Sequence, residues 1–63
     1  MSRLSDRLAA VQSIVVRDVK GVLWEVSRHW TAGHGLMRRL PSGKPIEIVL
    51  SALDSAGLVE VSQ

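Results

Sequence analysis

The sequence contains no cysteine, phenylalanine or tyrosine, and only two prolines among its 63 residues. Without cysteine, the chain can form neither a disulfide bond nor a cysteine-based zinc site. No apolar run approaches the ~20 residues of a membrane-spanning helix, and the N-terminus lacks the apolar core of a secretory signal. We therefore expect one small domain over residues 1–63, located in the cytoplasm and making no membrane contact.

Residues that could support catalysis are also scarce. His29 and His34 are the only histidines, and no cysteine or paired carboxylate accompanies them. The acidic residues stand singly, and no serine occupies a Gly-x-Ser-x-Gly sequence. A phosphate-binding loop around Gly43-Lys44 is excluded, because the pattern needs glycine at Arg38 and serine or threonine at Pro45. We predict no catalytic residue, metal or cofactor, and therefore no enzyme.

Charge is distributed unevenly along the chain. The segment 28–44 contains four basic residues and no acidic one, whereas residues 45–63 contain three acidic residues and no basic one. The basic residues of the segment are Arg28, Arg38, Arg39 and Lys44. We expect any electrostatic partner to contact this middle segment.

The N-terminal third allows two organisations. Ser2 or Ser5 can cap a first helix, in which Leu4, Leu8 and Val11 share one face. The preferred organisation then breaks the helix, because three consecutive β-branched residues at 14–16 favour a short strand.

In this organisation Asp18 caps a second helix over about residues 19–30, which buries Trp30 and leaves Trp24 partly exposed. The alternative is a single helix over residues 4–30 with a continuous apolar stripe from Leu4 to Trp30. Such a helix would need a partner to cover the stripe, which predicts a homodimer.

The C-terminal third predicts a loop, a helix and a strand. Residues 36–40 can form one helical turn, and residues 41–45 form a loop by composition. A last helix runs from about Pro45 to Ala56 and ends at Gly57, before a short strand over residues 58–61. Its core-facing residues would be Ile46, Val49, Leu50 and Leu53, and its outward residues Glu47, Ser51, Asp54 and Ser55.

Two stretches, "VVRDVKGVLWEV" and "IEIVLSALDSAGLVEV", resemble the winged helix-turn-helix family in the order of their elements. The resemblance implies a mostly α fold with a small β component, in which three helices are followed by a short or truncated wing. It also implies DNA binding through the last helix. That helix carries Glu47 and Asp54 on its outward face, and phosphates would repel both carboxylates. We therefore expect the basic loop, rather than the helix, to contact DNA.

These observations lead to two functional hypotheses. The first is a small nucleic-acid-binding accessory or regulatory protein that contacts DNA phosphates weakly and without sequence preference. Its contact residues would be Arg28, Arg38, Arg39, Lys44, the backbone amide of Gly43, and His34. The second is a protein-protein interaction module, such as a phage or plasmid-type inhibitor or regulator, that docks on an acidic partner surface. Trp24 would be its anchor.

Overall fold

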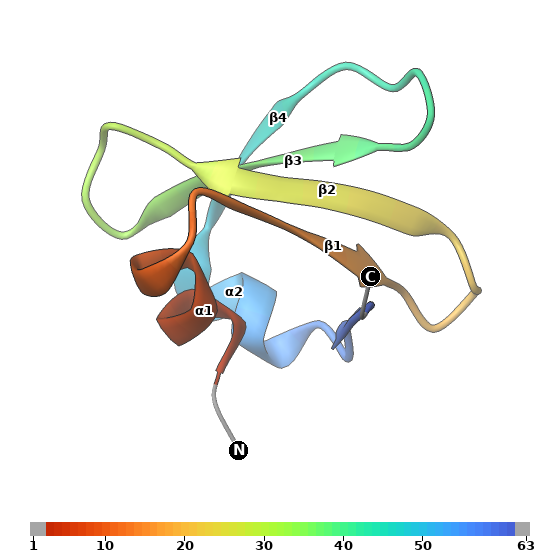
Figure 1. Cartoon of the computed structure of the whole chain (residues 1–63), viewed down its shortest axis with the longest axis horizontal. Helices are drawn as coiled ribbons and strands as arrows, with labels where there is room; N and C mark the ends of the chain where they lie inside the picture. The colour runs from red at the N-terminus through yellow and green to blue at the C-terminus, as the bar shows by residue number, and fades with distance from the viewer. Residues whose placement is uncertain (1–2, 62–63) are drawn as a thin grey trace.

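The computed structural model of the protein describes residues 3–61. A five-stranded antiparallel sheet with strand order β4-β3-β2-β1-β5 forms its main layer, and two short helices pack on one face of the sheet (Figure 1). The elements are α1 Leu4–Ala10, β1 Ser13–Arg17, β2 Leu23–Arg28, β3 His34–Arg39, β4 Ile46–Val49, α2 Leu50–Ser55 and β5 Val59–Glu60. The fold is mainly β, so the predicted mostly α, three-helix fold with a wing is wrong.

The largest correction concerns residues 19–30, which form a turn and strand β2 instead of a helix. Strand β2 pairs with β1 in a register that places Val26 opposite Ile14 and Trp24 opposite Val16. Val16 and Val26 are both fully buried on the same face. β-Branched residues pack well on a pleated surface and lose side-chain freedom in a helix, which favours the hairpin. The predicted strand at residues 14–16 is confirmed.

The chain between β1 and β2 reverses in a tight turn that starts at Asp18. The Asp18 amide donates to the carbonyl of Val22 at 3.0 Å, and Gly21 adopts a φ of 86°. No continuous helix runs from Leu4 to Trp30, so the apolar stripe proposed to form a homodimer does not exist.

The predicted C-terminal helix is correct only in its second half. Residues 46–49 form the edge strand β4, which pairs with β3, and α2 begins at Leu50. Ile46 and Val49 are 52% and 48% exposed, so the prediction that they face the core is wrong. Gly57 ends this region with a φ of 72°, and the strand predicted after it is confirmed as β5.

Five residues form the core between the sheet and the helices, and they come from four elements: Leu8, Ile14, Val16, Val26 and Leu53. The predicted first helix is confirmed as α1, and Leu8 is its buried residue. Ser5 lies inside the helix, and Ser2 lies outside the described residues.

Polar contacts fix the helices to each other and to the sheet. The Ser5 hydroxyl donates to Asp54 Oδ2 at 2.6 Å and joins α1 to α2. The Arg7 guanidinium donates to Glu60 Oε1 at 2.9 Å and joins α1 to β5. These hydrogen bonds lower the pKa of Asp54 and of Glu60, because they stabilise the charged carboxylates.

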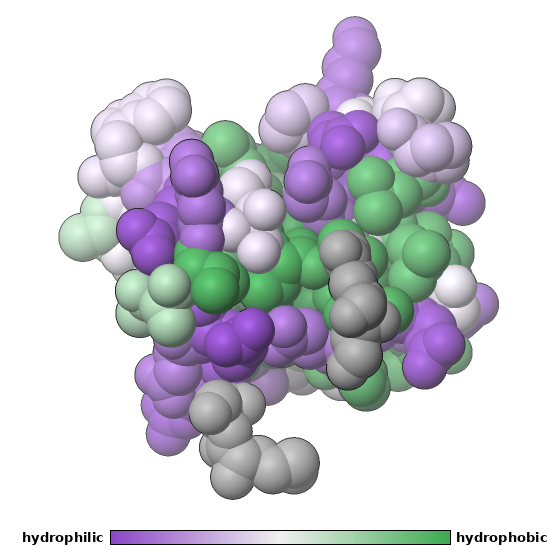
Figure 2. Space-filling view, in the orientation of Figure 1, coloured by the Kyte–Doolittle hydropathy of each residue, from purple (hydrophilic) through white to green (hydrophobic). Residues whose placement is uncertain are grey.

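The sheet and helices leave much apolar surface outside, as a chain of this length must. Figure 2 shows hydrophobic residues across the middle of one face, bordered by hydrophilic ones. Trp30, at the tip of the β2–β3 hairpin, is 89% exposed and stacks on His29 with ring centroids 4.0 Å apart. The prediction that Trp30 belongs to the core is therefore wrong. Within residues 3–61, no helix has the length and apolarity to cross a membrane.

Candidate nucleic-acid interface

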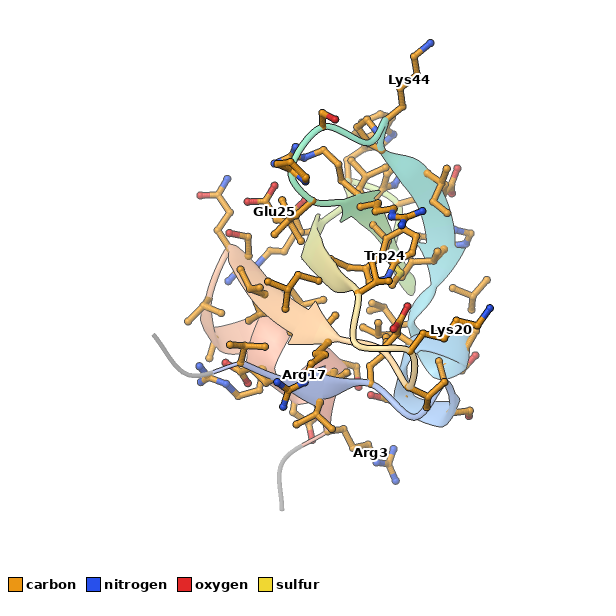
Figure 3. The ribbon with its side chains drawn as sticks, turned by 90° about the vertical axis from the view of Figure 1, so that its right-hand side faces the viewer. Arg3, Arg17, Lys20, Trp24, Glu25 and Lys44 are labelled. Atoms are coloured by element: carbon orange, nitrogen blue, oxygen red, sulfur yellow. The ribbon has the colours of Figure 1, made fainter. Side chains whose placement is uncertain are left out.

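One end of the sheet gathers basic side chains from separate segments. Strands β1 and β3 end there, and the β1–β2 turn and the β3–β4 loop follow them. We call this surface the basic end and define it by four exposed residues: Arg17, Lys20, Arg39 and Lys44. Figure 3 looks at this side of the molecule, where Trp24 lies between Lys44 and the pair Lys20 and Arg17. Within residues 3–61, none of the four forms a salt bridge.

The predicted residues Arg39, Gly43 and Lys44 come together here. The Gly43 amide donates to the Arg39 carbonyl at 2.7 Å, so it is already used and does not face a ligand. A Cβ atom at Gly43 would lie 2.7 Å from that carbonyl oxygen, which explains why the loop needs glycine at this position. No helix starts beside Gly43, because the next element is β4.

The other predicted contact residues lie elsewhere and have partners. Arg28, at the opposite end of β2, donates to the Leu8 carbonyl at 2.6 Å and to the Ala9 carbonyl at 3.2 Å, and so caps the C-terminus of α1. His34, at the start of β3, has its Nδ1 2.6 Å from Glu47 Oε2.

Arg38 precedes Arg39 in β3 but points to the opposite face of the sheet, because side chains alternate along a strand. It donates to Glu25 Oε1 at 3.0 Å and to the Pro41 carbonyl at 3.1 Å. Glu25 and Arg38 are direct cross-strand partners, so their charges offset each other beside the basic end.

Asp18 orders the β1–β2 turn and fixes Trp24. Its Oδ1 accepts hydrogen bonds from the Lys20 and Val22 amides, both at 2.9 Å. Its Oδ2 accepts one from Trp24 Nε1 at 3.0 Å. The indole hydrogen bond, followed by that of the Val22 amide, lowers the pKa of Asp18. The same carboxylate therefore presents Lys20 and holds the half-buried ring of Trp24 in place.

The lowered pKa of Asp18 predicts acid sensitivity of this turn. Unfolded chains take up the proton near pH ~3.9, above the folded pKa, so stability from this carboxylate falls as the pH drops below that value. We expect Asp18→Asn to lower the thermal unfolding midpoint at pH 7. The midpoint should also fall less between pH 7 and acidic pH than it does in the unchanged protein. Unfolding midpoints of both proteins across this range test it, with Asp6→Asn as the control. An unchanged acid dependence in Asp18→Asn would contradict the assigned role.

Sequence reasoning missed Arg17, Lys20 and the role of Asp18, because it placed Asp18 at a helix cap. The available signal was the turn composition of Asp18 to Gly21 between two β-branched segments, which is typical of a hairpin. Among residues 3–61, no three His, Asp or Glu side chains gather closely enough to hold a metal ion.

Comparison with known proteins does not assign the chain to a family. No protein-family model, curated protein or solved structure matches the chain.

Proposed function

We propose that this protein is a small, non-enzymatic nucleic-acid-binding accessory or regulatory protein that contacts DNA phosphates through its basic end. The observation that carries the proposal is the gathering of four exposed cations, without a salt-bridge partner among residues 3–61, at one end of the sheet. Lysine and arginine side chains neutralise phosphates and release bound counterions, which gives affinity without sequence preference.

The distribution of paired charges supports this choice of surface. Arg7 is paired with Glu60 and Arg38 with Glu25, so these cations are already neutralised. Arg28 is engaged by the C-terminal carbonyls of α1. Four cations without a salt-bridge partner among residues 3–61 therefore lie at one end of the sheet, with Arg39 on its helix-facing side and Arg17 on the other side. A cytoplasmic location, expected from the composition, belongs to the same proposal.

The proposal makes binding strongly dependent on salt. Four phosphate contacts correspond to a slope of about −3.6 for log K against log salt, or about a hundredfold loss of affinity between 50 and 200 mM. Fluorescence anisotropy of a labelled random duplex, titrated with protein at both salt concentrations, measures this slope. Steep weakening supports phosphate contact at the basic end. Absence of binding even at 50 mM contradicts it.

A protein-interaction module is the second candidate, and the exposure of Trp30 favours it. Trp30 stands at a hairpin tip, 89% exposed, and exposed tryptophans commonly anchor protein partners. Under this reading the basic end docks on an acidic protein surface, and Trp30 replaces Trp24 as the main anchor. Absence of DNA binding in the titration above would favour this candidate.

A further inference from the structure

An apolar groove opens beside the basic end, between α2 and the helix-facing side of the sheet. Its volume is about 290 Å³. Its walls include Trp24 and Met37 from the sheet and Ala52 and Ala56 from the α2 side. Its size lies at the lower limit of the ~300–1,000 Å³ typical of small-molecule sites, which suits a single ring system.

Trp24 connects this groove with the cations. It is the direct cross-strand partner of Arg39, so the two side chains leave neighbouring strands on the same face. On its other side, the ring is fixed by Asp18, and Lys20 follows in the same turn. A ring held by a hydrogen bond needs no further ordering when a ligand packs against it. An immobilised aromatic side chain therefore borders an apolar groove, with Arg39 on one side and, on the other, the Asp18 carboxylate that also lines the groove, followed by Lys20.

Nucleic-acid chemistry distinguishes two kinds of ligand for such a surface. Phosphates of a duplex can contact the cations, but its bases are stacked and paired and cannot enter a groove. Bases of a single strand are free to stack on aromatic side chains while neighbouring phosphates follow basic residues. The groove adds nothing to duplex binding and adds an apolar contact to single-strand binding.

We propose that the groove beside Trp24 accepts an unpaired base of a single-stranded nucleic acid, whose phosphates lie on Arg39 and Lys20. This inference rests on the proposed function and specifies the ligand of the same surface. It predicts tighter binding of single strands than of duplexes of equal length, by about tenfold for one stacked base.

The experiment uses the full chain with Trp30→Phe, which leaves Trp24 as the only tryptophan. Trp30 is exposed, so this change removes little packing. Labelled oligothymidylate of about 20 nucleotides, longer than the ~4–16-nucleotide site of small single-strand binders, and a duplex of equal length are titrated at low salt. Oligonucleotide anisotropy and Trp24 fluorescence are followed together. We expect tighter binding of the single strand and quenching of Trp24 by the single strand alone.

Ala52→Leu provides a variant that leaves Trp24 and every basic residue in place. Ala52 is exposed on α2 and lines the groove, so a larger side chain fills the groove while leucine keeps a high helix propensity. We expect it to remove the tenfold preference for single strands and to leave duplex affinity unchanged. Circular dichroism confirms that the variant is folded.

Two results would overturn the inference in different ways. Equal affinity for both ligands with unchanged Trp24 fluorescence would reject the base-binding groove and leave phosphate binding at the basic end intact. No anisotropy change with either ligand would reject the proposed function together with the inference.

Discussion

Leu53→Ala should lower the free energy of unfolding by about 2–5 kcal/mol, the usual effect of truncating a buried leucine. A domain of this length is stable by roughly 3–9 kcal/mol in total, so the variant loses a large part of its stability. Leu53 is 2% exposed and is the only residue of α2 in the five-residue core. Its loss leaves a cavity between α2 and the sheet that so small a core cannot refill.

Urea unfolding followed by circular dichroism measures this effect. Ser51→Ala, an exposed position on the same helix, is the control, and its unfolding free energy should change by less than about 0.5 kcal/mol. A loss below about 1 kcal/mol in Leu53→Ala would mean that α2 contributes little to the core and that the sheet is stable without it.

The hairpin of β1 and β2 shows why the helical prediction failed. Val22, Val26 and Trp30 recur every four residues, which fits one face of a helix, but four is also twice the two-residue repeat of a strand. The spacing therefore could not separate the two structures. Side-chain type favours the strands, because six of the thirteen residues at 14–26 are β-branched and favour pairing across strands. The helix at α1 and the stop at Gly57 are confirmed, whereas the helix predicted from Pro45 begins only at Leu50.

In the candidate site, residues close together in the sequence could be grouped by prediction, whereas residues brought together by the fold could not. Arg39 ends β3 and Lys44 lies in the loop that follows it, so the basic segment could be identified directly from the sequence. Arg17 and Lys20 join them only because the chain reverses at Asp18 and again after Ala32, which places the ends of β1 and β3 at the same end of the sheet, on either side of β2. The same pairing places Arg28 at the opposite end of the sheet, although the sequence analysis grouped it with Arg39 in the basic segment 28–44.

Replacing Arg39 and Lys44 together by glutamine should weaken binding to a random duplex by at least tenfold at low salt. It should also make the slope of log K against log salt shallower by about two, since each lost phosphate contact reduces it by about one. Both side chains are exposed and form no salt bridge with any residue from 3 to 61, so the fold should not change. Arg38 is left in place because its bonds to Glu25 and Pro41 hold the strand pair.

Arg3→Glu is the matched control for this double variant. It exchanges one positive for one negative charge, so the net charge falls as much as it does when two cations become neutral. Arg3 precedes α1 and lies apart from Lys44 in Figure 3. If contact at the basic end determines affinity, anisotropy titrations will show a larger loss of affinity for the double variant than for Arg3→Glu. Only the double variant will then have a shallower slope of log K against log salt. Equal losses of affinity in both variants would instead mean that binding depends on the net charge of the protein. Long-range attraction depends on net charge, whereas a phosphate contact depends on the position of the side chain.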